Sequence, residues 1–166
     1  AIQLLSALPA VNLHRASQWR PVEFLAGLSY EAAERPREAT SAFVRAEALA
    51  RARLAHQPRD ARTLSTLALI HAGLGDVDAA VREAEAAVDM NPPRMDVVEG
   101  PHNLFNLAAV YVRAGRLDEA TATLSELLSY PNMYNAVRVE NDYLMRPLRG
   151  HRDFQILIER EKARSF

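Results

Sequence analysis

Two successive stretches of this chain, residues 61–92 and 101–131, repeat one spacing of small and apolar residues. Each stretch has a glycine-containing turn at its centre, AGLGD at 72–76 and AGRLD at 114–118, and ends at a proline. Apolar residues recur in each half at the i, i+3, i+4, i+7 positions of an amphipathic helix. The spacing therefore predicts two helix–turn–helix units. The recurring residues are Leu64, Leu67, Ala68, His71, Ala80, Ala84, Ala87 and Pro92, then Leu104, Leu107, Ala108, Tyr111, Ala120, Leu124, Leu127 and Pro131.

The composition agrees with packed helices. The chain has 166 residues, which is enough for one domain with a core, and 49% of them are hydrophobic, mainly Ala and Leu. A net charge of -1 gives no attraction to nucleic acid or to an acidic membrane surface. No apolar run approaches the roughly 20 residues that span a bilayer, so we expect no membrane insertion. The lack of cysteine excludes disulfides and leaves the compartment open between cytoplasm, which we favour, and periplasm.

The spacing resembles the tetratricopeptide repeat, W-x2-L-G-x2-Y, then A-x3-F, then P. A degenerate earlier copy begins near Arg20, with Gly27, Tyr30, Ala39 and Phe43 in register. The resemblance implies an all-α fold, a right-handed α-solenoid of about three helix hairpins with a C-terminal capping helix. The expected divisions of this single domain are an N-terminal segment 1–19, repeat 1 at 20–58, repeat 2 at 59–92, a loop at 93–100, repeat 3 at 101–131 and a cap at 132–166.

Two irregularities have a physical explanation. Repeat 1 exceeds the family period of about 34 residues, and no helix breaker precedes Pro58, so we expect a lengthened second helix. Further along, Pro92 and Pro93 forbid helix continuation, so the extra residues there must form a loop.

The C-terminal stretch YLMRPLRGHRDFQILIER resembles the ending W-x-P-L-R-x-D-P-R-F-x-x-L of one bacterial lineage of such arrays, although Gly150, His151 and Asp153 depart from it. In that lineage the array follows adenylate-cyclase-like, TolB-like, winged-helix or serine/threonine kinase domains. The resemblance implies a C-terminal recognition array in a multi-domain signalling or regulatory protein.

Motifs for catalysis or cofactor binding are missing. The sequence contains no GxxxxGK[ST] loop and no G-x-S-x-G elbow, and its five histidines form no i, i+4 pair. His71 is interpreted as a packing residue, Glu83 and Glu85 as part of a solvated face, and the arginines of 45–62 likewise. We therefore expect no catalytic residue, no cofactor, no metal and no enzymatic activity.

In the resembled family the first helix of each repeat lines a concave face that binds protein segments. The corresponding residues form a mainly apolar groove that suits an apolar or amphipathic peptide, not a carboxylate clamp. The chain could instead fill the groove itself, through a neighbouring helix or through the N-terminal segment with Trp19 as its anchor. Homo-oligomerisation and small-ligand binding are two further hypotheses for the role of the chain. The predicted groove residues are Phe24, Leu28, Glu31, Arg62, Ser65, Leu69, His102, Phe105, Ala109, Val112 and Arg113.

Overall fold

The computed structural model describes residues 19–164, and every regular element within that range is a helix. The elements are α2 (Val22–Ala32), α3 (Pro36–His56), α4 (Ala61–Leu74), α5 (Val77–Met90), α6 (Gly100–Arg113), α7 (Leu117–Leu128), α8 (Ala136–Asn141), the 3-10 helix η1 (Tyr143–Gly150) and α9 (Arg152–Arg164). None of these helices combines the length and the apolar character needed to cross a bilayer.

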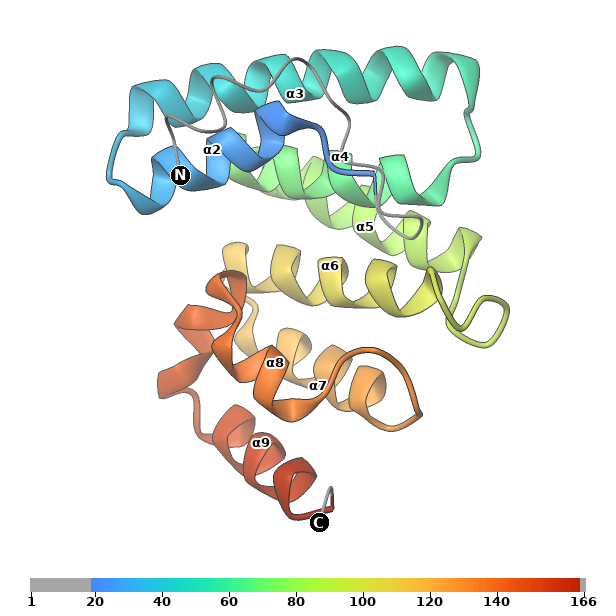
Figure 1. Ribbon diagram of the computed structural model, residues 1–166, viewed down its shortest axis with the longest axis vertical. Helices are drawn as coiled ribbons and strands as arrows, with labels where there is room; N and C mark the ends of the chain where they lie inside the picture. The colour runs from blue at the N-terminus through green and yellow to red at the C-terminus, as the bar shows by residue number, and fades with distance from the viewer. Residues whose placement is uncertain (1–18, 165–166) are drawn as a thin grey trace.

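The helices stack as consecutive pairs, with α2–α3 at one end of the long axis and α9 at the other (Figure 1). The pairs α2–α3, α4–α5 and α6–α7 each pack internally, and α4 also contacts α3 and α6. At the far end η1 packs on α6, and α9 packs on α7. The predicted all-helical, tetratricopeptide-like solenoid is confirmed.

The turns inside the two recurring units share a left-handed glycine but differ in how the next helix is capped. Gly75 and Gly115 have φ values of 87° and 74°, the left-handed region that ends a helix without a Cβ clash. Asp76 then caps α5, because its carboxylate accepts a hydrogen bond of 3.2 Å from the backbone N–H of Ala79. Arg116 occupies the same place before α7 and gives no side-chain cap. Helix α7 therefore lacks the stabilisation that a side-chain cap gives to α5.

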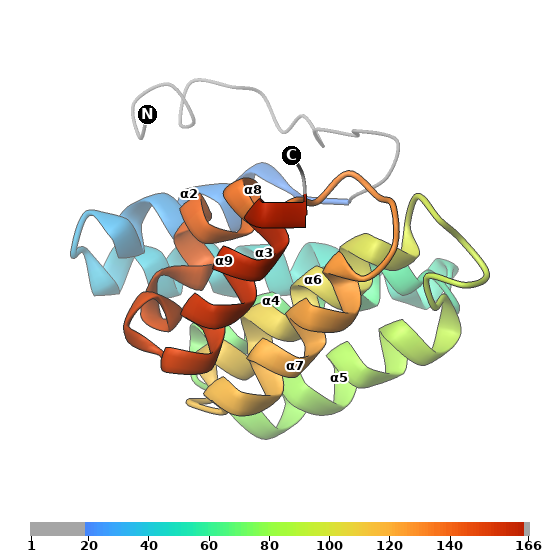
Figure 2. The same ribbon diagram turned by 90° about the horizontal axis from the view of Figure 1, so that it is seen from below.

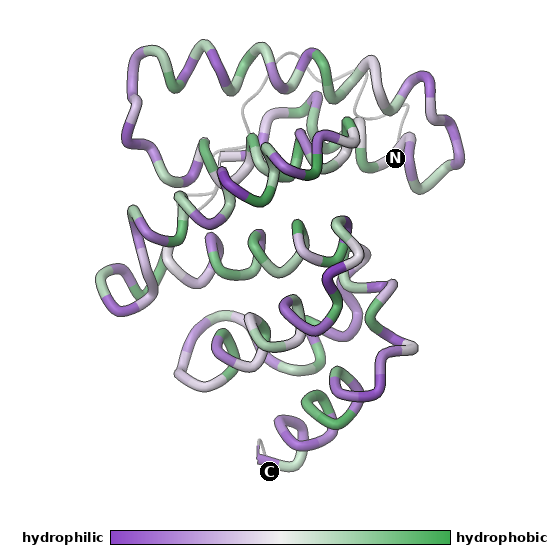
Figure 3. The backbone as a smooth tube through the Cα atoms, turned by 180° about the vertical axis from the view of Figure 1, so that it is seen from behind, coloured by the Kyte–Doolittle hydropathy of each residue, from purple (hydrophilic) through white to green (hydrophobic). Residues whose placement is uncertain are grey.

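The core depends on small residues where helices cross. The recurring alanines of α5, Ala80, Ala84 and Ala87, are fully buried, and hydrophobic residues recur turn by turn along the helices (Figure 3). The ring of Phe43 on α3 lies where two glycines leave space for it. A Cβ built on Gly27 of α2 or Gly73 of α4 would come within 2.5 Å or 2.7 Å of that ring. Phe43 thus joins the first helix pair to the second.

The two stretches that depart from the repeat spacing form a long helix, α3, and a hydrogen-bonded loop between α5 and α6. Helix α3 runs for 21 residues, and its extension packs Ala46 and Ala50 into the core. The loop between α5 and α6 is held from within, since the Asp96 carboxylate accepts hydrogen bonds from the backbone N–H groups of Val98 (2.9 Å) and Glu99 (2.8 Å). Helix α6 then starts at Gly100.

The C-terminal elements α8, η1 and α9 cover the last helix pair, α6–α7. Asn135 caps α8 and Asp142 caps η1 through their side chains. Phe154, Leu157 and Ile158 of α9 are buried, and α9 contacts α7, α8 and η1. The apolar face of the last helix pair is thereby shielded from water.

Replacing Gly100 with alanine tests the close approach between the α5–α6 loop and α6. The new Cβ would lie 2.5 Å from the backbone nitrogen of Pro93, and backbone atoms cannot rotate away. We expect the free energy of unfolding to fall by about 1–3 kcal/mol in urea denaturation. Gly150→Ala is the control, because no atom lies within 4 Å of its Cβ position. Equal stability of the two variants would contradict this packing.

Candidate functional site

The first helices of the pairs, α2, α4 and α6, form the inner face on which the sequence predicts a groove. Most of the predicted groove side chains are buried there, so they do not line an open surface. The reason is that segments of the same chain cover them, a possibility that the sequence leaves open. The buried residues are Phe24, Ser65, Leu69, His102, Phe105, Ala109 and Val112.

Tyr134, which lies just before α8, covers the inner face of α6. Its ring stacks on Phe105 with the centroids 4.6 Å apart and the planes 14° from parallel. Its hydroxyl lies 2.6 Å from Nδ1 of His102, in a buried hydrogen bond. The chain must turn back across α6 to make both contacts, as the position of α8 in Figure 2 indicates. Tyr134 therefore occupies the place predicted for a ligand of this helix.

Trp19 and Arg20, which precede Pro21 and α2, cover the adjoining part of the inner face. The Thr66 hydroxyl donates a 2.6 Å hydrogen bond to the backbone carbonyl of Trp19, whose side chain is buried. The Arg20 guanidinium donates to Oδ1 of Asn106 at 3.1 Å, and the Asn106 amide donates to the Ser65 hydroxyl at 2.8 Å. Burial lowers the pKa of Arg20 from its ordinary value. Trp19, the anchor in the alternative that the N-terminal segment fills the groove, is buried, while the rest of the predicted N-terminal segment, residues 1–18, lies outside the described residues.

Three of the predicted groove residues meet at the end of the inner face, in what we call the end pocket. Arg113 of α6 binds Glu31 of α2 through two hydrogen bonds of 2.9 Å and 2.5 Å. The pocket has a volume of about 250 Å³, and its aromatic wall, Tyr143, keeps 42% of its surface exposed. It therefore combines fixed charge, an accessible ring and aliphatic surface. The lining residues are Glu31, Val112, Arg113, Tyr143, Leu144, Arg146 and Pro147.

Two further predicted residues lie apart from one another. Leu28 is half-buried against the core. Arg62 binds Asp60 at 3.4 Å and Glu99 at 3.1 Å, beside a pocket of about 570 Å³ at the start of α4. The predicted groove residues that are not fully buried therefore lie at separate places, with Glu31 and Arg113 at the end pocket, Leu28 against the core and Arg62 at the start of α4.

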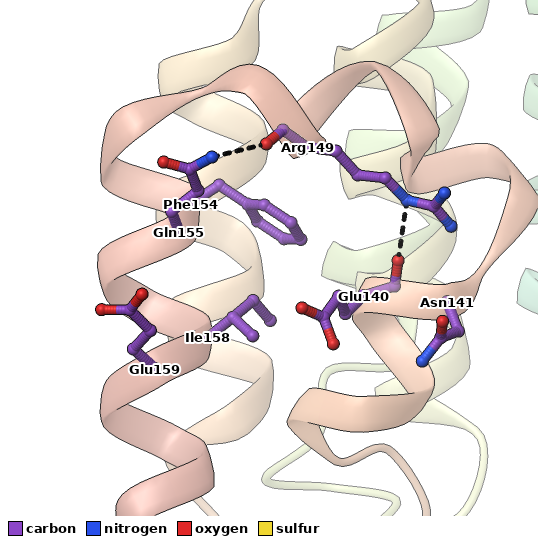
Figure 4. Close-up of a pocket in the computed structure, with 7 residues that line it drawn as sticks. All are labelled: Glu140, Asn141, Arg149, Phe154, Gln155, Ile158 and Glu159. Carbon is purple, nitrogen blue, oxygen red and sulfur yellow. Dashed lines mark hydrogen bonds between the residues drawn. The ribbon is translucent and has the colours of Figure 1, made fainter.

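A larger pocket of about 590 Å³ lies between α8, η1 and α9 (Figure 4). Its polar groups hold these elements together. Arg149 donates to the backbone carbonyl of Glu140 at 3.2 Å, Gln155 donates to the carbonyl of Arg149 at 2.8 Å, and Lys162 binds the Glu140 carboxylate at 2.6 Å. The arrangement ties the C-terminal helices to one another and presents no nucleophile paired with a base.

Several polar side chains pair across neighbouring helices, and the sequence alone does not indicate these pairs. His71 packs as predicted, but Nδ1 lies 2.7 Å from the Glu83 carboxylate and Nε2 lies 3.3 Å from that of Glu47. Burial raises the pKa of Glu83, opposed by the neighbouring His71. Glu85 is exposed as predicted, yet it accepts a 2.8 Å hydrogen bond from the Tyr111 hydroxyl. Within the described part of the chain, no group of three or more acidic, histidine or cysteine side chains is placed to hold a metal ion.

His102 makes the covered inner face sensitive to acid. Burial, together with the charges of Arg20 and Arg138, lowers its pKa from 6.5 to about 4. Between these values the unfolded chain binds a proton that the folded chain does not, so stability must fall as the pH is lowered. From pH 7.5 to 5.5 we expect His102 to remove about 1 kcal/mol of unfolding free energy.

Urea denaturation across this pH range measures the effect, with His102→Asn as the comparison, because its side-chain amide can still bond near the position of Nδ1. The difference in slope between the two proteins isolates the contribution of His102 from those of the carboxylates. Parallel pH profiles would show that His102 is not held neutral by its surroundings.

The family comparison bears on the second helix pair. Residues 61–94, which include α4 and α5, match the model of the tetratricopeptide repeat family. Neither a curated protein nor a solved structure matches the chain. The match supports a module that binds other proteins, which is the general role of such repeats. The chain therefore carries a tetratricopeptide repeat at residues 61–94, within a longer solenoid of helix pairs.

Proposed function

We propose that the chain binds a segment of a partner protein at the end pocket. The observation that supports this is the pocket itself, since Glu31, Val112 and Arg113 are predicted groove residues and line an open cavity together. Elsewhere on the inner face, Tyr134 and the pair Trp19–Arg20 already occupy the positions a ligand would take. A partner would find its apolar and charged contacts at the pocket without displacing them.

The chemistry of the end pocket favours a segment with an acidic residue beside an apolar one. Arg113 is held in place by Glu31, while Arg146 is exposed and makes no ion pair with any residue that the structure describes. Tyr143 supplies an accessible ring next to Leu144 and Pro147. Tyrosine and arginine are the side chains that most often dominate binding energy in interfaces. A carboxylate on the partner would meet Arg146, and an apolar side chain would pack on Tyr143.

The wider role we propose is that of a recognition array attached to a signalling or regulatory protein, without enzymatic activity of its own. The resemblance of the stretch from Tyr143 to Leu157 to the ending of such arrays supports it. The same stretch supplies Tyr143, Arg146 and Pro147 to the end pocket, and two of them, Tyr143 and Pro147, are residues that fit the resembled ending.

Peptide selection tests the binding site directly. A library of random peptides is selected on the purified chain, and affinities of the selected peptides are measured by fluorescence anisotropy. We expect selected peptides to combine Asp or Glu with an apolar neighbour. The double variant Tyr143→Ala, Arg146→Glu should weaken their binding by about tenfold or more, because it removes the ring and reverses the free charge.

The matched control is Arg82→Glu, which reverses an exposed arginine on α5, away from the end pocket. Circular dichroism verifies that both proteins stay folded. Peptides that bind all three proteins equally would place the binding site elsewhere, and selection of basic peptides would contradict the assigned chemistry.

A further inference from the structure

The loop between α5 and α6 carries an exposed apolar cluster. Met95 and Val97 are each 73% exposed and Val98 is 56% exposed, although they are adjacent in a short segment. The loop is not loose, because the backbone N–H groups of Met95 and Asp96 bind the carbonyl of Pro92. The result is a fixed apolar projection on the surface, which we call the loop knob (residues 94–98).

The backbone of the loop knob also leaves hydrogen-bond acceptors exposed. Among the described residues, no hydrogen bond reaches the backbone carbonyl of Met95 or of Val97. The residue four positions after Val97 is Pro101, which has no N–H to offer. The knob therefore presents apolar side chains together with open carbonyl oxygens.

Beside the loop knob lies an apolar cavity of about 530 Å³, which we call the proline pocket. Tyr130 is one of its lining residues, and the Tyr130 hydroxyl is buried and has no hydrogen-bond partner among the described residues. Burial and the nearby Glu126 raise the pKa of Tyr130 to about 12, so the hydroxyl keeps its proton as a donor. The lining residues are Val88, Asp89, Pro92, Pro93, Arg94, Val97, Glu126, Tyr130 and Pro131.

We infer that the loop knob of one molecule docks in the proline pocket of a second copy of this chain, and reciprocally, as a symmetric dimer. Knob and pocket share a border at Val97, so a two-fold axis near this residue satisfies both contacts at once. Met95 of one copy fills the apolar cavity of the other.

The charges around the pocket agree with a second copy as the occupant. Arg94 is on the knob side of the border, while Asp89 and Glu126 are on the pocket rim, and all three are exposed. A two-fold axis brings Arg94 of one copy toward the two carboxylates of the other, twice per dimer. This surface is separate from the end pocket, because the two share no lining residue.

Sedimentation equilibrium over a wide range of concentration tests the dimer. The mass should rise from 18.5 kDa toward twice that value as concentration increases. Met95→Asp should hold the protein at the monomer mass, because it places a charge in the apolar cavity. Val137→Asp, at a side chain 55% exposed on α8, should leave the association unchanged.

Cysteine cross-linking tests the position of the axis, because the chain has no cysteine of its own. Under mild oxidation Val97→Cys should form a disulfide-linked dimer rapidly, and Val137→Cys should not. The inference is overturned by a monomer mass at every concentration, or by equal cross-linking of the two variants. Association that Met95→Asp leaves intact would also overturn it, since another surface would then be responsible.

Discussion

The inner face of α4 and α6 carries aromatic and hydrogen-bonding side chains that cannot be buried without partners, and the chain supplies those partners itself. Tyr134 stacks on Phe105 and bonds His102, while Arg20 bonds Asn106, which bonds Ser65. Burying such groups without hydrogen bonds would cost free energy at each one. Because residues from before α2 and after α7 meet on this face, the helix pairs are tied together from both ends. Because these residues cover the inner face, a partner can bind only on the surface that they leave open.

Helix pairs and their turns were predictable because their signals are local. The spacing of Leu67, Ala80 and Ala84 defines the buried stripes within a few turns of helix, and Gly75 with Asp76 defines the turn between them. The family match over residues 61–94 lies where these signals are clearest.

The closure of the inner face was not predictable in the same way. Tyr134 lies 29 positions after Phe105, and nothing near it in the sequence indicates that the chain turns back over α6. For the end pocket, Glu31, Val112 and Arg113 follow from the helical pattern. Tyr143 and Arg146 do not, because their placement depends on how η1 packs against α6. The two binding surfaces that we propose lie where the chain departs from the repeat spacing, at the α5–α6 loop and after Pro131.

Nuclear Overhauser contacts in solution can show whether the chain closes its own inner face. We expect strong contacts between the ring protons of Tyr134 and those of Phe105 and His102, with the Tyr134 ring shifts displaced by stacking. A Tyr134 ring with solvent-like shifts and no contact to α6 would contradict it, because the inner face would then be open.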